Sequence, residues 1–158
     1  MSAASVNAGD AQHVAETAAR QMYEQDSASR ALGMRILEIR PGFARLVMQV
    51  RDDMVNGHQI CHGGLIFTLA DSAFAFACNT YNLVTVAAGG SIDFLRPGRL
   101  GDTLTATAEE RSRSRRTGIY DVTVLNQAGE CVAMFRGRSH QTSDRIVAET
   151  PEPGASLA

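Results

Sequence analysis

The sequence predicts a single α+β domain, built in the order helix, hairpin, long helix and then a run of antiparallel strands. Two observations carry this prediction. Apolar residues recur at helical spacing near the N-terminus and fill a second, longer segment over residues 64–80. From Val84 onward, short segments rich in β-branched residues are separated by Gly and Pro, a pattern typical of antiparallel hairpins.

The N-terminal third predicts one helix and one hairpin. Residues 1–10 are small and polar, and we expect them to form a flexible arm. Asp10 can cap a helix over roughly residues 11–25. The next two segments have β-like composition and are separated by residues that favour a turn. They are Leu32–Ile39 and Phe43–Val50, with the turn at Arg40-Pro41-Gly42.

The segment over residues 64–80 predicts a central helix, and the loop that precedes it contains residues suited to catalysis. It is apolar nearly all round, so we expect it to be buried on every side. Asp71 lies in its middle, where a carboxylate is costly to bury unless it is used. The preceding polar loop ends in Gly63 and Gly64, which leave backbone N–H groups open to an incoming oxygen. A positioned carboxylate and exposed amide donors are what acyl transfer requires.

The remaining segments predict strands. Gly89-Gly90 marks a bend within one strand over residues 84–95. Residues 103–110 alternate between apolar and Thr side chains, as a half-buried strand does. A turn at Gln127-Ala128-Gly129 joins two further strands, residues 118–126 and 131–140. Residues 143–158 are expected to form a flexible tail, which leaves one domain over residues 11–142.

Composition narrows the functional classes. The 158 residues are 44% apolar and 20% charged, ordinary values for one globular domain. A net charge of −2 gives no indication of a nucleic-acid partner. All 15 basic residues are Arg, so a phosphate group must be met by Arg or by backbone amides. Three Cys without a secretory signal pattern predict a cytoplasmic protein, and no apolar run predicts a membrane span.

Five blocks of sequence, in one order, resemble the phenylacetic-acid-degradation hotdog thioesterases. His-Gly-Gly alone would be a weak signal, but the ordered set is specific and extends from about residue 15 to residue 141. The blocks are Asn56-Gly57-His58…Cys61-His62-Gly63-Gly64, Leu69-Ala70-Asp71, Ser91-Ile92-Asp93-Phe94-Leu95-Arg96-Pro97-Gly98, Gly101-Asp102-Thr103-Leu104 and Thr117-Gly118-Ile119-Tyr120-Asp121.

This resemblance implies a hotdog fold, in which an antiparallel sheet wraps a long central helix. It implies hydrolysis of acyl-CoA thioesters, particularly phenylacetyl-CoA and its ring-hydroxylated relatives. No metal or cofactor is implied, since coenzyme A is part of the substrate. His13 and His140 are isolated and lack metal-ligand spacing. The implied assembly is a homotetramer built from hotdog dimers.

The resemblance also assigns catalytic roles. Asp71 would act as general base toward water or as nucleophile toward the thioester, and both routes stay open. The alternative is a helix carboxylate paired with a nearby Arg. The Gly63 N–H would polarise the thioester carbonyl at the helix N-terminus. Asn56 would orient the thioester or the water, while His62 is either catalytic or a structural support of the loop.

Helix geometry adds a constraint on the assembly. Gly63 and Asp71 are eight residues apart in sequence. On one helix they would be separated by roughly 12 Å along the axis, too far for both to touch one carbonyl. We therefore expect each active site to take Gly63 from one subunit and Asp71 from its partner, with the two helices antiparallel about a two-fold axis.

The remaining substrate contacts follow from the resemblance alone. The pantetheine arm would lie along the strand that contains Ser91, Asp93 and Phe94, with Gly64 beside it. A cluster of arginines, Arg111 to Arg116, precedes Thr117-Gly118. A solvated hairpin end is one interpretation of this cluster. The other is a binding site for the CoA phosphates, formed by Arg113, Arg115, Thr117 and Gly118.

Two other functions are alternatives to thioester hydrolysis for a domain of this kind. A hotdog hydratase would place a His and a carboxylate together at the helix entrance, whereas Asp71 lies deep in the helix. A non-catalytic acyl-CoA sensor would lack the carboxylate and would carry a DNA-binding segment. The position of Asp71 disfavours the hydratase, and its presence disfavours the sensor, so these two functions are kept as the alternatives to thioester hydrolysis.

Overall fold

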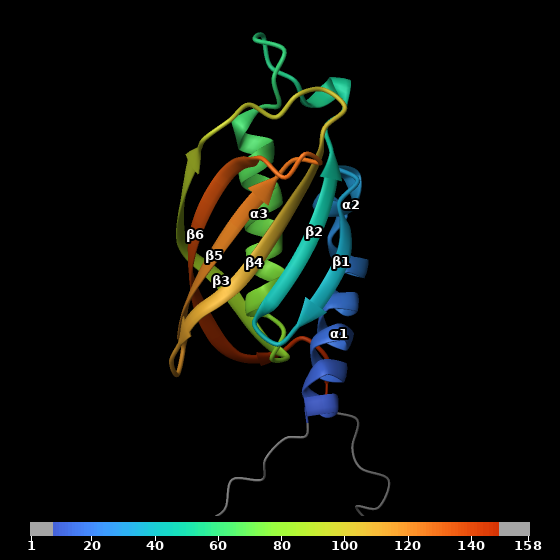
Figure 1. Ribbon diagram of the computed structural model, residues 1–158. Coiled ribbons are helices and arrows are strands. Elements are labelled where there is room, and N and C mark those ends of the chain that lie inside the picture. Colours follow the sequence, from blue (N-terminus) through green and yellow to red (C-terminus); the bar gives the residue numbers. More distant parts are fainter. Residues whose placement is uncertain (1–7, 149–158) are drawn as a thin grey trace, which may run out of the picture.

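The computed structural model describes residues 8–148. Figure 1 shows a curved antiparallel sheet wrapped around one long helix, α3 (Gly63–Cys78). Within the described range the sheet has six strands in the order β1-β2-β4-β5-β6-β3. The predicted α+β architecture, with a central helix against an antiparallel sheet, is confirmed.

The strands follow the predicted hairpin signals closely, and every pairing is antiparallel. Gly42 and Gly129 have positive φ values of 70° and 78°, so the turn that each was predicted to form requires glycine. The register of β3 against β6 shifts between Ala87 and Gly89, at the predicted bend. The strands are β1 (Arg35–Arg40), β2 (Phe43–Gln49), β3 (Leu83–Phe94), β4 (Thr103–Arg113), β5 (Thr117–Leu125) and β6 (Cys131–Arg145).

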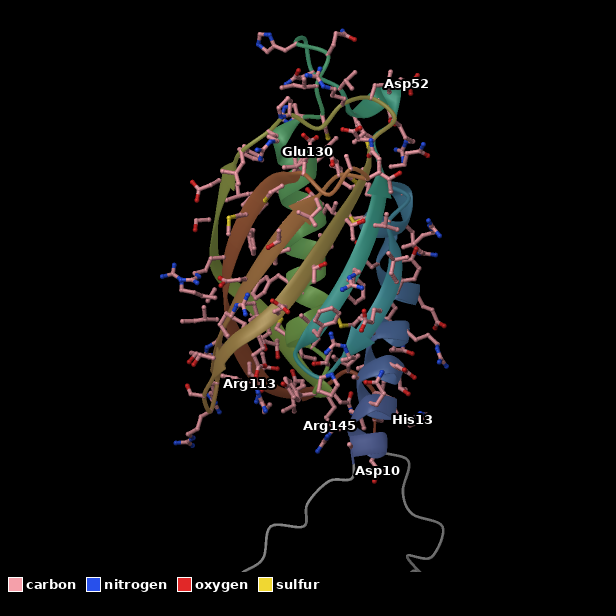
Figure 2. All side chains as sticks on the ribbon, viewed as in Figure 1. Asp10, His13, Asp52, Arg113, Glu130 and Arg145 are labelled. Atoms are coloured by element: carbon pink, nitrogen blue, oxygen red, sulfur yellow. The ribbon has the colours of Figure 1, made fainter. Side chains whose placement is uncertain are left out.

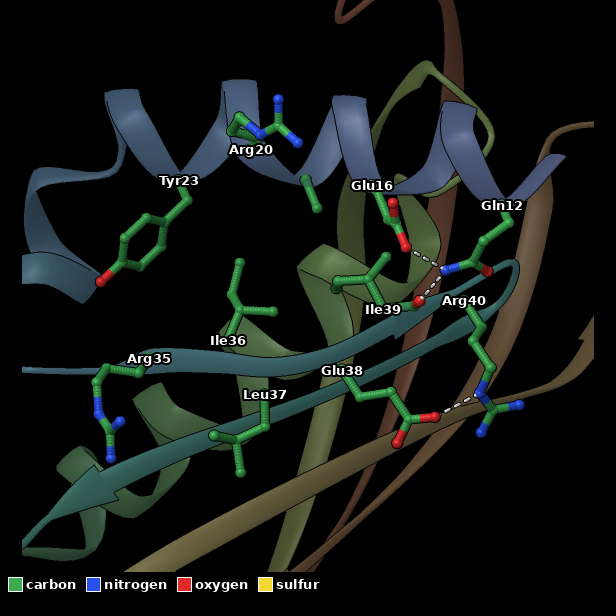
Figure 3. A pocket seen from close by; sticks show the side chains of 11 residues that line it. Gln12, Glu16, Arg20, Tyr23, Arg35, Ile36, Leu37, Glu38, Ile39 and Arg40 are labelled. Atoms are coloured by element: carbon green, nitrogen blue, oxygen red, sulfur yellow. Dashed lines mark hydrogen bonds and ion pairs between the residues drawn. The ribbon is translucent and has the colours of Figure 1, made fainter. Parts of the chain in front are cut away.

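The first helix, α1 (Ala8–Gln25), lies along the edge strand β1 (Figure 3). The side-chain amide of Gln12 donates to the Ile39 carbonyl at 2.8 Å, and the Tyr23 hydroxyl donates to the Met34 carbonyl at 2.6 Å. These two bonds fix α1 against the sheet at both of its ends. None of the helices within residues 8–148 has the length and apolar character needed to cross a membrane.

A short helix, α2 (Ser27–Ala31), was not predicted. Asp26 caps it, because its carboxylate accepts from the Ser29 N–H at 2.9 Å. Gly33 follows with a φ of 69°. This helix and its exit turn occupy the start of the segment predicted as a strand from Leu32, so β1 begins only at Arg35.

The predicted arm and tail are partly wrong. Residues 8–10 belong to α1, and Asp10 lies in its first turn instead of capping it. Residues 143–145 extend β6, and the Val147 N–H donates to the Asn82 side chain at 2.8 Å. The sheet therefore orders this segment through pairing that a local pattern cannot show. Residues 1–7 and 149–158 lie outside the described residues.

The prediction that α3 is buried on every side is also wrong. Its apolar residues from Ile66 to Cys78 pack against the sheet. The opposite face carries Gly64, Thr68, Asp71 and Ala75, spaced by four, three and four residues, and this stripe stays half-buried or exposed. A single curved sheet can cover only one side of a helix, so in one chain this face has no cover from the sheet.

Asn79 joins the end of α3 to β3. Its side chain donates to the Ala75 carbonyl at 2.9 Å and to the Thr85 carbonyl at 2.8 Å, and it accepts from the Thr85 N–H at 2.9 Å. Asn79 is only 5% exposed, and its two bonds to Thr85 are buried. Buried polar groups need hydrogen-bond partners, and this one side chain supplies them to backbone groups of both elements.

We predict that Asn79→Ala lowers the free energy of unfolding by about 2–4 kcal/mol, because it leaves buried backbone groups of Thr85 without partners. Urea denaturation of both proteins measures the change. Asn126→Ala is the matched control, since Asn126 also makes three hydrogen bonds, but in an exposed turn. It should cost less than about 1 kcal/mol, because water replaces the lost partners. Equal losses in the two variants would contradict the prediction.

Candidate active site

The loop before α3 projects from one end of the molecule (Figure 1) and is closed by a bridge between Val55 and Cys61. Asn56 organises it. Its side-chain oxygen accepts from the His58 N–H at 2.9 Å, and its backbone N–H donates to the Ile60 carbonyl at 2.8 Å. The amide nitrogen of the Asn56 side chain makes no bond within residues 8–148. Asn56 therefore holds the loop with its oxygen and keeps two donor hydrogens for another group.

The first turn of α3 leaves one particular amide unused. The His62 ring nitrogen Nδ1 accepts from the Gly64 N–H at 3.1 Å, so His62 caps the helix. The Gly63 N–H finds no acceptor in the part of the chain that the structure describes. The amide predicted to polarise a carbonyl is therefore available, while the Gly64 amide is already engaged. The cap gives His62 a structural role, and a catalytic role for His62 stays a prediction.

Asn56, Gly63 and Phe94 meet at one cavity of about 470 Å³. Its walls come from the loop before α3, the first turns of α3, and the segment from Phe94 to Gly98. The Phe94 ring covers Gly63 so closely that a Cβ on Gly63 would lie 3.0 Å from its Cζ. The structure thus brings three of the predicted site residues together at the N-terminus of α3.

Asp71 lies two turns further along α3 and lines a different cavity, of about 520 Å³. Its carboxylate makes no hydrogen bond and no ion pair within residues 8–148. The alternative interpretation, a carboxylate paired with a nearby Arg, is therefore not what the described residues show. Burial raises the pKa of Asp71 above its ordinary value of 3.8, because the charged form loses solvation without gaining a partner.

One chain does not bring Asp71 and Gly63 together. The two residues line separate cavities, as their spacing on one helix required. The chain by itself therefore presents the amide donor at one place and the carboxylate at another.

The predicted pantetheine strand divides between two faces of the sheet. Phe94 faces Gly63, and Ile92 packs against the core. Ser91 and Asp93 line a separate cavity of about 310 Å³ together with Asp121 and Arg136. Because successive side chains of a strand alternate between faces, Ser91 and Asp93 cannot share a cavity with Phe94 in the same chain.

The arginine cluster lies at the hairpin between β4 and β5, at the end of the molecule opposite the Gly63 loop (Figure 1). Figure 2 shows Arg113 there, far from Asp52 at the other end. Arg111 pairs with Glu109 at 2.9 Å and with Asp121 at 3.1 Å. Arg115 and Arg116 form no ion pair within residues 8–148. Within this cluster, the cationic groups available to a phosphate are therefore those at the hairpin tip.

Arg113 is held by a network that the sequence did not reveal. Its guanidinium stacks over the Tyr81 ring at 3.7 Å, and its Nε lies 3.6 Å from the Glu110 carboxylate. The same carboxylate oxygen accepts from the hydroxyls of Tyr120 at 2.7 Å and Tyr81 at 3.0 Å. No local motif marks Tyr81 or Glu110, since the network joins three separate elements.

Thr117 and Gly118 follow the arginines at the start of β5. The Thr117 hydroxyl lies 3.1 Å from the Ser114 hydroxyl and helps to close the hairpin. Gly118 is buried, and a Cβ there would come within 2.7 Å of the Tyr120 ring and 2.8 Å of the Ser139 hydroxyl. Packing therefore accounts for the glycine. Binding of CoA by these two residues stays a prediction.

Two features lie outside these residues. A cavity of about 740 Å³ lies between α1 and β1 (Figure 3), and none of the predicted site residues lines it. Among residues 8–148, no three His, Cys, Asp or Glu side chains are grouped so as to hold a metal ion.

Comparison with known proteins identifies the family. Residues 58–133 match the model of the thioesterase superfamily. The acyl-coenzyme A thioesterase PaaI of Escherichia coli (strain K12) is 50% identical over 137 residues, which cover 87% of this chain and 98% of that protein. The chain belongs to the thioesterase superfamily. The predicted enzyme class, a thioester hydrolase, is confirmed, as is the resemblance to the phenylacetic-acid-degradation thioesterases.

Comparison with solved structures confirms the hotdog fold. The E. coli PaaI protein from the phenylacetic acid degradation operon superposes with a TM-score of 0.84 at 50% identity, covering 85% of this chain and 97% of that one. A Streptococcus mutans protein bound to acetyl-CoA superposes with a TM-score of 0.69 at 30% identity. That match covers 71% of this chain and 90% of the other.

We predict that Asp71→Asn stabilises the protein at neutral pH. The folded state raises the pKa of Asp71, so the charged carboxylate destabilises the fold and the neutral carboxyl does not. The protein therefore has this part of its stability below pH 3.8 and loses it as the pH rises through the folded-state pKa. Asn carries no charge and escapes this loss. Thermal unfolding across pH should therefore show a higher midpoint for the variant near pH 7, and a smaller difference in acid. A variant less stable than the parent at pH 7 would contradict this reasoning.

Proposed function

We propose that this thioesterase hydrolyses acyl-CoA thioesters, in particular phenylacetyl-CoA or its ring-hydroxylated relatives. One observation carries the proposal. The helix α3 presents an unpaired, half-buried carboxylate, that of Asp71, to one cavity and an unused N-terminal amide, that of Gly63, to another. Their chemistry is that of thioester hydrolysis. The E. coli relative is named an acyl-coenzyme A thioesterase, and its structure is that of a protein from the phenylacetic acid degradation operon. These names support the choice of substrate.

In the proposed reaction, the Gly63 N–H donates a hydrogen bond to the thioester carbonyl oxygen. The helix N-terminus stabilises the negative charge that develops there. Asp71 then acts in one of two ways. As a general base it takes a proton from the attacking water. As a nucleophile it attacks the carbonyl carbon and forms an anhydride that water hydrolyses. In both routes the carbon–sulfur bond breaks, and CoA leaves as a thiolate that takes up a proton.

The active site is proposed to form between two subunits. The uncovered stripe of α3, from Gly64 to Ala75, offers a face for the same helix of a second copy. An antiparallel arrangement about a two-fold axis brings Gly63 of one chain toward Asp71 of the other, twice. It also brings the β4–β5 hairpin of each chain toward the Gly63 loop of its partner. Arg115 and Arg116 would then approach the phosphates of a bound CoA. Pairing of dimers into a tetramer, and the cytoplasmic location, stay predictions.

The role of each group can be tested by thiol release from phenylacetyl-CoA. Asp71→Asn should lower kcat by about 10²–10⁴-fold, because the base or nucleophile is lost. Asp10→Asn, an exposed carboxylate in the first turn of α1, is the control and should match the parent. Retained binding of acyl-CoA without thiol release by the parent protein would instead indicate an acyl-CoA sensor.

The Gly63 amide allows a sharper comparison. Gly63→Pro removes the N–H at the first helical position, where Pro is well tolerated. His62, with φ −59° and ψ 128°, already has the conformation that a following Pro requires. Gly63→Ala keeps the N–H and places a Cβ against Phe94, as Pro does. We expect the Pro variant to be about 10²-fold slower than the Ala variant. Equal rates in the two variants would exclude the amide from the chemistry.

Mixing inactive variants tests the shared site. A heterodimer of Asp71→Asn and Gly63→Pro chains has one site with both defects and one with neither. Random pairing should restore about a quarter of the parent activity, since half of the dimers carry one intact site of two. Co-expression of two tagged chains followed by thiol release measures the recovery. No recovery in a purified heterodimer would show that each chain uses its own Gly63 and Asp71.

A further inference from the structure

We propose that the cavity beside Asp71 receives the acyl group, and that Met22 and Gln25 of α1 select which aromatic ring it accepts. This rests on the proposed thioesterase function and assigns its substrate selectivity to residues outside the sequence motifs. The cavity is about 520 Å³, within the range of small-molecule sites. Its lining comes from α1, α3, β3 and the end of β6 with the residue that follows it.

The floor of this cavity is a continuation of the helix face that carries the carboxylate. Asp71, Ala75 and Asn79 follow one another at intervals of four residues, so they lie above one another on α3 and at its end. A thioester carbonyl next to Asp71 would therefore point its acyl group along this face, toward Asn79. Ala75 in the middle of the floor leaves the space that a planar ring needs.

The wall opposite the floor is formed by α1, and it is fixed in place. Met22 is half-buried and packs against the core. The neighbouring Tyr23 anchors the helix through its bond to the Met34 carbonyl, and its ring lies 6.3 Å from that of Phe76 on α3. The Ser29 hydroxyl of α2 lies 3.2 Å from the Ser72 hydroxyl, next to Asp71 in sequence. A wall held to α3 in this way can discriminate between acyl groups by size.

One polar group of the lining is left for a ligand. The Asn79 amide is fully used by Ala75 and Thr85, and the Thr85 hydroxyl donates to the Leu83 carbonyl at 2.8 Å. Arg145 has a partner of its own within the chain. The Gln25 side chain forms no hydrogen bond within residues 8–148. Its side-chain amide can both donate to and accept from a hydroxyl on an aromatic ring.

The arrangement therefore separates two kinds of selectivity. Met22 limits the width of the ring, because it occupies the apolar wall. Gln25 recognises a ring hydroxyl, because its amide is the lining group with unused hydrogen-bonding capacity apart from Asp71. An arylacetyl group without a hydroxyl would need only the apolar wall.

The first experiment replaces Gln25 with Leu and compares kcat/KM for phenylacetyl-CoA with that for 3- and 4-hydroxyphenylacetyl-CoA. We expect the ratio to shift by about tenfold against one of the hydroxylated substrates, the size of one lost hydrogen bond. The value for phenylacetyl-CoA itself should stay within about twofold. Glu24→Leu is the matched control, since Glu24 is exposed, adjacent in sequence and not part of the cavity lining.

The second experiment fills the cavity from the same helix. Met22→Phe should lower kcat/KM for phenylacetyl-CoA by about tenfold or more, because a rigid ring occupies the space of the substrate ring. Hydrolysis of acetyl-CoA should change by less than about twofold, since that acyl group does not reach the wall. Acetyl-CoA thereby reports on folding and on the catalytic groups in the same variant.

The outcomes separate the two proposals. An unchanged ratio in Gln25→Leu overturns the role of Gln25, and equal losses for acetyl- and phenylacetyl-CoA in Met22→Phe overturn the acyl cavity. In both cases the proposed function still holds if the parent releases thiol and Asp71→Asn does not. A parent protein that releases no thiol from any acyl-CoA overturns both.

Discussion

The packing of one face of α3 into a curved sheet is the constraint on which the rest of this structure depends. The helix can approach the strands closely because small residues face it. A Cβ at Gly137, for example, would lie 2.9 Å from the Phe74 ring. Ala106 and Ala108 of β4 are completely buried for the same reason. Since the sheet wraps only one side, the same packing leaves the stripe from Gly64 to Ala75 open and thereby presents Asp71.

The Asp71 carboxylate lowers the stability of the fold but is placed where it can take part in chemistry. An unpaired, half-buried carboxylate gives up solvation without any hydrogen bond in return, and its raised pKa reflects that cost. Nothing in the packing of the single chain requires a charge at this position. A residue that opposes folding and lines a cavity is a candidate for function, because perturbed groups of this kind gather at active sites.

The helix α3 presents different groups at its N-terminus and in its second half. At its N-terminus, His62 engages the Gly64 amide and leaves the preceding amide, that of Gly63, exposed to a cavity. Toward its C-terminus, Asp71 and Asn79 border the second cavity, near the end of the molecule that carries the arginine hairpin. Donor and carboxylate are thus separated along one rigid helix. A two-fold partner is the simplest way to unite them, and it would do so in two identical sites.

The sequence by itself determined the features that depend on neighbours in the chain. The long helix, the glycine turns and the alternation of β4 are local patterns, and Asp71 and Gly63 stood out because of their immediate surroundings. Only the tertiary structure decided which polar groups are already engaged. His62 occupies the Gly64 amide, and Glu110 holds Arg113. These contacts join distant elements, so no window of sequence contains them.

The same reason explains the remaining differences. Strand alternation, once the sheet is formed, separates Ser91 and Asp93 from Phe94, although the three lie within one motif. Pairing with β3 orders residues 143–145, which read as a tail. Gln25 carries no signal in sequence and reaches the Asp71 cavity only because α1 packs across α3 and β1. Local sequence patterns therefore determined the helices, the strands and the candidate reacting groups, whereas long-range packing determined which residues those groups contact.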